Sequence, residues 1–465
     1  ASGVYTYSTI NANGCDSTAT LNLTINSSTA STTSVTECDT YSWNGTNYTS
    51  SGIYTYLTTN SNGCDSTATL NLTINNSSSL ITNVTTCSNY TWNGVTYDST
   101  GIYTFVPPHQ ITQIGSDING LFWGEQFGFT VRLNNNADIV AVSAPFNQTN
   151  GQESGETRIF NWDGTTWNQL GNSIGGESSE DLSGEWNGLS INDDGDIVAI
   201  GAVGNDGNGS DAGHVRIYEW DGTTWNQMGN DIDGEAAGDR SGQSVSLSSD
   251  GNTVAIGAPK AENSTNYRMG HVRVFEWDGS NWSQKGQDID GENNDDESGW
   301  TNSISDDGNV VAIGSRWNDG NGNDAGHVRI YEWDGTTWNQ RGQDIDGEAP
   351  DDQSGWSLDI NSIGDIVSIG SRNNDNPNGS NYGHVRIYKW NGTNWSQLGQ
   401  DVDGTTGGFA ASISLSNDGY SLAASAPSSF VKYYDYDGNS WIERGLSIDL
   451  SNFQTGPWPS ISSNH

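Results

Sequence analysis

A short segment of small and apolar residues recurs along the second part of the chain, and this repetition constrains the fold more than any other feature. Its copies are DIVAVSAP, DIVAIGAV, NTVAIGAP, NVVAIGSR, DIVSIGSR and YSLAASAP, and they follow one another at intervals of 55 to 58 residues. A period of this length is typical of solenoids, propellers and other repeat architectures. Because each copy is apolar at consecutive positions, it predicts a strand that is buried on both faces in the middle of a sheet.

Four strands can be predicted in each repeat. The first follows a Ser-Gly pair, as in SVSLS, the second is the recurring segment, the third is GHVRIYEW and the fourth is TTWNQMGNDI. Four-stranded sheets repeated around an axis form a β-propeller, with an open solenoid as the competing geometry. Residues 111–120 match only the fourth strand of a unit, and residues 456–463 match only the first. We therefore expect seven blades in the intact protein, with six as the alternative.

A different repeat, with a period of 49 residues, occupies residues 1–105. Its copies share GVYTY, GIYTY or GIYTF, the segment CDSTATLNLTIN, and YSWNG or YTWNG. The apolar residues of TLNLTI alternate, which predicts a strand with one buried face, and the pairs Asn44-Gly45 and Asn93-Gly94 suit tight hairpin turns. The sequence therefore predicts an all-β chain with small β-sandwich-like modules at 1–33 (partial), 34–82 (complete) and 83–106 (partial), then a propeller at 107–465 that is incomplete at its C-terminal end.

The four cysteines all lie in these modules. Units of this size bury too little apolar surface to be secure alone, so the cysteines indicate disulfides and an oxidising compartment. The preferred pairing is Cys38 with Cys64. The alternatives are Cys15 with Cys38 together with Cys64 with Cys87, or unpaired buried thiols.

The charge of the chain excludes some partners. It has 57 Asp and Glu against 16 Lys and Arg, a formal charge of -41, so nucleic acid and anionic membranes are poor partners.

No apolar stretch is long enough to span a membrane as a helix, so no membrane insertion is expected. Hydrophobic residues make up only 32% of the chain, yet 19 Trp, 18 Tyr and 10 Phe indicate a folded β protein rather than disorder.

Catalytic motifs are not evident. Four of the six histidines occupy one repeated position, GHVR, which favours a structural role in each repeat over a single active site; they are His214, His271, His327 and His384. Neither a Gly-x-Ser-x-Gly elbow nor a His-Glu-x-x-His motif occurs. We therefore expect no enzyme, with a propeller glycosidase or lyase as the less favoured class.

Two sets of residues are candidate binding sites. Calcium takes six to eight oxygen ligands, which the loops NDGNGSDAG and NDGNGNDAG offer at nearly alternating positions, with a metal-free polar hairpin as the alternative; the candidate ligands are Asp206, Asn208, Asp211, Asp319, Asn321 and Asp324. Trp186, Trp300 and Trp356 stand after Ser-Gly at the start of a repeat, whereas the third repeat has Gln243 there. An incomplete set of aromatic residues predicts a surface for stacking on sugars, with packing against loops as the alternative.

The second region resembles the FG-GAP propellers, which include the head of the integrin α-subunit. The resemblance rests on Phe127-Gly128 followed by Ser-Ala-Pro, and on Gly257-Ala258-Pro259. It implies a propeller fold and says little about function. The calcium loop of such propellers is shortened here to Asp250-Gly251 and Asp307-Gly308, which argues against calcium at that position.

The first region resembles the Cys/WNG/GCDS repeats of large surface adhesins that Bacteroidetes export by type IX secretion. The resemblance implies an extracellular or cell-surface protein and O-glycosylation at Ser17, Ser66 and Ser99. We therefore expect an adhesin or filament segment whose modules present a propeller to glycans or surface proteins. The competing expectation is a structural subunit that contacts neighbouring copies of itself in a fibre or sheath.

Overall fold

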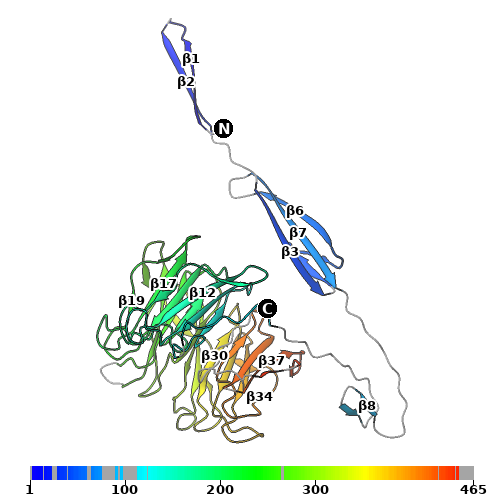
Figure 1. The fold of residues 1–465 in the computed structure, drawn as a ribbon, viewed down its shortest axis with the longest axis vertical. Helices are drawn as coiled ribbons and strands as arrows, with labels where there is room; N and C mark the ends of the chain where they lie inside the picture. The colour runs from blue at the N-terminus through cyan, green and yellow to red at the C-terminus, as the bar shows by residue number, and fades with distance from the viewer. Residues whose placement is uncertain are drawn as a thin grey trace. The chain divides into compact units, whose positions relative to one another are not determined.

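The computed structural model describes residues 3–13, 15–23, 29–38, 40–59, 64–75, 90–92, 95–97, 113–122, 124–262, 267–427, 429–445 and 447–449. The chain divides into two compact units, residues 1–105 and 106–465. Every element in the described part is a β-strand, as the aromatic, threonine-rich sequence predicts (Figure 1). None of these described segments is a helix that could cross a membrane.

The first unit is built from hairpins and one small sheet. Strands β1 (Gly3–Ile10) and β2 (Asp16–Leu23) form a hairpin, as do β4 (Tyr41–Trp43) with β5 (Thr46–Tyr48) and β8 (Tyr90–Trp92) with β9 (Val95–Tyr97). Strand β7 (Asp65–Asn75) lies between β3 (Thr29–Cys38), to which it is parallel, and β6 (Gly52–Thr59), to which it is antiparallel.

The alternating pattern of TLNLTI gives β7 its buried face. Leu70, Leu72 and Ile74 are buried at alternate positions; the partly buried side chains packed against them are Val35, Tyr41, Trp43, Tyr48 and Tyr54. The predicted turn between β4 and β5 is confirmed, because Asn44 and Gly45 have φ angles of 47° and 75°. Asn93 lies outside the described residues.

The predicted disulfide between Cys38 and Cys64 is not tested, because the side chain of Cys38 lies outside the described part of the structure. Cys87 lies outside it as well. No disulfide joins the two cysteine side chains that are described, Cys15 and Cys64.

The second unit contains, in its described residues, six antiparallel sheets that follow one pattern. Each has an inner, a second, a third and an outer strand, the outer one in two pieces that both pair with the third. In Figure 1 the sheets run from cyan (β12) and green (β17) to yellow (β30) and orange (β37). The inner strands are β10 (Val131–Leu133), β15 (Leu189–Ile191), β20 (Ser244–Leu247), β25 (Thr301–Ile304), β30 (Ser354–Ile360) and β35 (Ile413–Leu415).

The second strands carry the recurring apolar segment and are almost completely buried, as predicted. They are β11 (Ile139–Ala144), β16 (Ile197–Ala202), β21 (Thr253–Ala258), β26 (Val310–Ser315), β31 (Ile366–Ser371) and β36 (Ser421–Ala426). The third strands are β12 (Glu156–Trp162), β17 (His214–Trp220), β22 (His271–Trp277), β27 (His327–Trp333), β32 (His384–Trp390) and β37 (Phe430–Tyr436). The outer strand pieces are β13 (Trp167–Gln169) and β14 (Ile174–Gly175), β18 (Trp225–Gln227) and β19 (Ile232–Asp233), β23 (Trp282–Gln284) and β24 (Ile289–Asp290), β28 (Trp338–Gln340) and β29 (Ile345–Asp346), β33 (Trp395–Gln397) and β34 (Val402–Asp403), and β38 (Trp441–Glu443) and β39 (Ile448–Asp449).

The turns that follow the inner strands join the sheets into a closed ring. In the first five of the six described turns a backbone N–H donates to a backbone carbonyl of the next sheet, at 2.9 to 3.1 Å; the donor and acceptor residues are Asn135 to Asp193, Asp193 to Ser249, Ser249 to Asp306, Asp306 to Ser362 and Ser362 to Asn417. The side-chain amide of Asn417 then donates to the side-chain oxygen of Asn135, at 3.0 Å.

This last bond joins the sixth sheet to the first, residues 282 positions apart in the sequence. The preferred count of seven blades is therefore corrected to the alternative of six for the described residues, because six sheets already bring the first and the last into contact. Residues 456–463, which suggested a further blade, lie outside the described part of the chain.

Pairs of tryptophans fasten neighbouring blades at the outer rim. In the fifth blade Trp390 and Trp395 pair across β32 and β33, with ring centroids 5.4 Å apart. The indole N–H of Trp395 donates to the carbonyl of Arg341 in the fourth blade, at 2.7 Å. A side chain at Gly342 would place a Cβ 2.6 Å from Trp390, so only glycine permits this close approach. The segment WNGTNW of this blade, which corresponds to WDGTTW at 162–167, 220–225 and 333–338, therefore serves the contact between blades.

Candidate ligand site in the central channel

The inner strands of the six described blades surround a channel with a cavity of about 230 Å³. Because the inner strands carry the same part of each repeat, equivalent residues come together around the axis. The residues that precede the strands gather at one end of the channel, and the hydrogen-bonded ring of turns lies where the strands end.

The middle of the channel is lined by hydroxyl groups that also join the blades. The hydroxyl oxygen of Ser190 accepts a hydrogen bond from the backbone N–H of Leu247 in the next blade, at 3.0 Å. Ser246 and Ser303 accept equivalent bonds from the blades that follow them, at 3.1 and 3.3 Å. Ser414 occupies the same position in the sixth blade. The channel wall is therefore polar, although the blades behind it are apolar.

Two charged residues replace serine at this position. In the fifth blade the carboxylate of Asp359 accepts bonds from the backbone N–H of Leu415, at 2.8 Å, and from the hydroxyl of Ser303, at 3.0 Å. In the first blade the residue is Arg132. Burial raises the pKa of Asp359, which the hydrogen bonds and the charge of Arg132 oppose. Burial likewise lowers the pKa of Arg132, against the charge of Asp359. The six-fold channel thus carries an asymmetric charge pair.

The three predicted tryptophans come together at the end of the channel where the inner strands begin. The ring centroids of Trp186 and Trp300 are 5.2 Å apart, and those of Trp300 and Trp356 are 5.5 Å apart. Phe129 of the first blade makes an edge-to-face contact with Trp186 at 6.0 Å. These aromatic rings line the same cavity as the serines and the charge pair. Residues from four blades therefore form one aromatic cluster.

The tryptophans differ in what they leave exposed. Trp300 is only 7% exposed, and the guanidinium of Arg316 lies 3.2 Å from the centre of its ring. Arg316 is held by Glu297, with a nitrogen-to-oxygen distance of 3.0 Å between buried side chains. Trp186 and Trp356 are partly exposed. The exposed ring surface at this end of the channel therefore belongs to Trp186 and Trp356, although Arg316 also lies 4.8 Å from the ring centre of Trp356.

Two ionisable groups and one buried amide border this end of the channel. Burial raises the pKa of Glu185, the neighbour of Trp186, to about 7, although the charge of Arg240 opposes the shift. The guanidinium of Arg372 lies 4.7 Å from the ring centre of Trp356. In the third blade Gln243 is 2% exposed, and its side-chain nitrogen has no hydrogen-bond partner among the described residues. The aromatic cluster is therefore bordered by groups of both charges.

The predicted calcium loops have an internal hydrogen-bonding pattern. In the first loop the carboxylate of Asp206 accepts from the backbone N–H of Asp211, at 2.9 Å, and the side chain of Asn208 donates to the carbonyl of Gly234, at 2.8 Å. In the second loop Asp319, Asp324 and Asn321 repeat these contacts, with Asn321 donating to Gly347. These bonds account for the residues as a polar hairpin, and calcium there stays a prediction.

Sequence reasoning missed the charge pair in the channel and assigned the repeated histidines to structure alone. Arg132 and Asp359 could have been found, because each stands where the other repeats have serine. The histidines each lie beside two carboxylates contributed by different parts of the repeat. The groups found among the described residues are Glu177, His214 and Asp231; Glu235, His271 and Asp288; Glu292, His327 and Asp344; and Glu348, His384 and Asp401.

The predicted glycosylation sites fall in the first unit. Ser17 lies in β2 and Ser66 in β7, while Ser99 lies outside the described residues. Modification at these positions stays a prediction.

No family model matches the sequence, and no curated protein matches it. Among solved structures, the chain is similar to a putative 6-phosphogluconolactonase from Bacteroides uniformis, with 13% identity and a TM-score of 0.48, over 70% of this chain and 86% of that one. It is also similar to the β-propeller domain of Cps50 (Swd1) from Myceliophteria thermophila, with 9% identity and a TM-score of 0.46, over 75% and 92% of the two chains. Similarity at this level assigns neither a family nor an activity.

Proposed function

We propose that this chain is a non-enzymatic segment of an extracellular adhesin or cell-surface filament, whose propeller binds a glycan at the aromatic end of its central channel. The observation that carries the proposal is the joining of Trp186 and Trp356 to a cavity lined by serine hydroxyls, Arg132 and Asp359. A sugar needs both features, because its C–H face stacks on an aromatic ring while its hydroxyls require hydrogen-bonding groups.

The size of the cavity limits the ligand. Its volume of about 230 Å³ lies below the roughly 300–1,000 Å³ of pockets that enclose drug-sized molecules. We therefore propose that one sugar residue enters the channel and that the remainder of a glycan lies outside it. The charge pair of Arg132 and Asp359 favours an occupant with both hydrogen-bond donors and acceptors over a purely apolar one.

The experiment is a glycan-array screen of the whole chain, repeated with Trp186→Ala and Trp356→Ala. The proposal predicts selective binding that falls at least about tenfold in either variant, which corresponds to about 1.4 kcal/mol. Tyr267→Ala is the matched control, because Tyr267 is 49% exposed and does not line the channel. Absence of binding by the unmodified chain, or equal losses in the control, would refute the proposal.

A structural fibre subunit is the second candidate function, and the hairpin of β1 and β2 favours it. Its apolar side chains Val4, Tyr7, Ile10 and Leu21 are 56–71% exposed. Exposed apolar side chains on a two-stranded hairpin provide a surface on which further strands can pair. Light scattering as a function of concentration tests this function, which predicts growing assemblies that Tyr7→Lys abolishes.

We also propose that the protein is located at the cell surface. The likeness of the first unit to type IX-secreted adhesins supports a location at the cell surface. Mass spectrometry of the natural protein tests this setting through glycans on Ser17, Ser66 and Ser99. The same peptides would report whether Cys38 is bonded to Cys64.

A further inference from the structure

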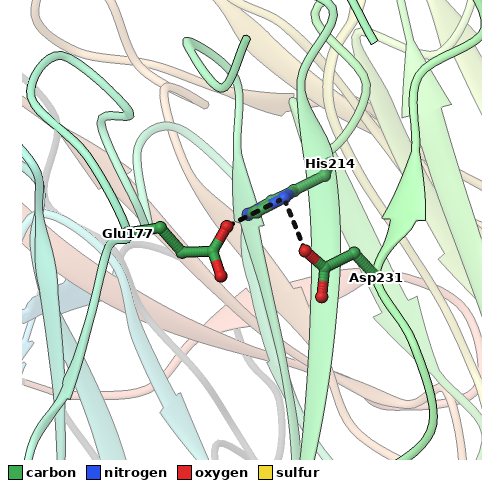
Figure 2. Close-up of side chains that lie close together, drawn as sticks. All are labelled: Glu177, His214 and Asp231. Carbon is green, nitrogen blue, oxygen red and sulfur yellow. Dashed lines mark ion pairs between the residues drawn. The ribbon is translucent and has the colours of Figure 1, made fainter. Parts of the chain in front are cut away.

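A histidine flanked by two carboxylates recurs at four successive boundaries between described blades. At the first boundary Glu177 follows the outer strand of the first blade, whereas His214 begins β17 and Asp231 precedes β19 in the second blade. The three residues therefore belong to two blades. Figure 2 shows both carboxylates directed toward the imidazole ring of His214.

The distances at this boundary suit a shared cation. The Nδ1 atom of His214 lies 3.4 Å from Oδ2 of Asp231 and 4.0 Å from Oε2 of Glu177 (Figure 2). Zinc binds nitrogen and oxygen at about 2.0–2.2 Å, so two of its ligands are about 3.4 Å apart in tetrahedral geometry. The distance to Asp231 matches this separation, whereas the exposed side chain of Glu177 would have to move about 0.6 Å closer to complete the site.

The buried ring nitrogens of His214 indicate a bound ligand. His214 is 1% exposed, and neither of its ring nitrogens has a hydrogen-bond partner within the described part of the chain. A buried polar atom without a partner is costly, which is why most such atoms in folded proteins are satisfied. A cation at Nδ1 would satisfy the nitrogen of His214 that faces the carboxylates. In the other three clusters the buried nitrogen without such a partner is Nε2, on His271, His327 and His384, so the argument from an unpaired Nδ1 applies to the first cluster.

The surroundings of the two carboxylates leave them open to a cation. Arg216 lies 3.6 Å from Oε1 of Glu177, which leaves Oε2 directed toward the histidine. Access from solvent is open, because the side chains of Glu177 and Asp231 are 45% and 29% exposed.

We propose that each of the four clusters binds a divalent transition-metal cation, with zinc as the test ion, and so links adjacent blades. One imidazole and two carboxylates form a donor set of the kind that zinc takes, whereas calcium prefers six to eight oxygens. The first and sixth blades lack the donor set, since Glu156 and Phe430 replace the histidine. The proposal is independent of the glycan site, because the clusters lie outside the channel lining.

The test is a zinc titration of the whole chain after chelator treatment, with cysteine thiols blocked by iodoacetamide so that they cannot bind the metal. The proposal predicts four zinc equivalents per chain by calorimetry and elemental analysis, and three in Asp231→Asn. The matched control is Glu219→Gln, which removes an exposed carboxylate from the same strand as His214 and keeps four.

A second readout does not depend on stoichiometry alone. Cobalt substitution should produce the visible absorption of a tetrahedral site, which His214→Gln reduces by one quarter. Retention of less than one equivalent by the unmodified chain would overturn the proposal, as would four equivalents that persist in Asp231→Asn. Near-ultraviolet circular dichroism of each variant verifies that the blades remain folded.

Discussion

The inner and outer ends of the blades differ in how closely they follow the repeat. At the outer rim nearly every blade carries the same tryptophan pair, with only Tyr436 replacing one member in the sixth. At the channel the equivalent residues vary between blades, from serine to Arg132 and Asp359 and from tryptophan to Gln243. Packing between identical blades requires the same contact each time, whereas a ligand on the axis meets all blades at once and needs different groups. Under the proposed function, the rim therefore provides stability and the channel provides recognition.

The largest expected effect comes from breaking the rim. Trp395 is 3% exposed and bonds to the fourth blade through its indole N–H. Trp395→Ala should lower the free energy of unfolding by about 3–5 kcal/mol, as for other buried tryptophans. Urea denaturation measures this loss. Glycan affinity under native conditions should be unchanged, and a loss of affinity without a loss of stability would contradict the division between rim and channel.

A second effect is the pH dependence of stability that arises from the four histidines at the start of the third strands β17, β22, β27 and β32. Burial, followed by the charge of the neighbouring arginine, lowers the pKa of the four histidines from 6.5 to about 4. Between these values the unfolded chain binds protons that the folded chain does not, so stability falls as pH falls from 6.5 to about 4 and then levels off.

Each histidine contributes on the order of 3 kcal/mol to this change at most. Urea denaturation at pH 7 and pH 4.5, in the presence of chelator, measures it. His214→Gln should reduce the difference between the two pH values. A difference that is the same in this variant would show that His214 is not one of the groups responsible.

A third effect comes from restoring the repeat in the channel. Asp359→Ser gives the fifth blade the serine of its neighbours, which can still accept a hydrogen bond from Leu415. The account predicts a loss of glycan affinity of about tenfold or more, or about 1.4 kcal/mol, because the charge pair is removed. The free energy of unfolding should fall as well, because the buried Arg132 loses the charge that opposes its burial. Array binding and urea denaturation of the same sample check both parts.

The smallest effect is expected at the closure of the ring. Five of the joints between inner turns are backbone hydrogen bonds, but the joint between the sixth and first blades uses the side chains of Asn417 and Asn135. Asn417→Ala should cost about 0.5–1.5 kcal/mol, the usual contribution of one hydrogen bond. Hydrogen exchange should show faster opening of the first and sixth blades than of the third, and uniform exchange would contradict this.

The sequence predicts the repeated parts of this fold well, because periodicity reports local structure. The buried second strands and the turn at Asn44 follow from patterns within a few residues. The number of blades does not, since the bond between Asn135 and Asn417 depends on curvature accumulated over the whole ring. The preferred count of seven relied on partial matches at 111–120 and 456–463.

The candidate site was predictable in part for the same reason. Trp186, Trp300 and Trp356 were recognised as departures from the repeat, and the ring brings them together. Trp186 stands one residue farther from its Ser-Gly than Trp300 and Trp356 do from theirs. The backbone of Trp186 has a positive φ of 54°. The contact between the guanidinium of Arg316 and the ring of Trp300 could not be predicted from the sequence. Arg316 follows the second strand of the blade, β26, whereas Trp300 precedes the inner strand.

The most direct test of the central claim is a crystal structure of the chain soaked in the monosaccharide that terminates the best glycan on the array. The account predicts a single sugar ring in the central channel, stacked on Trp186 or Trp356 and within hydrogen-bonding distance of Asp359 or the serine hydroxyls. A sugar bound instead to the tryptophan pairs of the outer rim, or a channel that stays empty at saturating sugar, would contradict it.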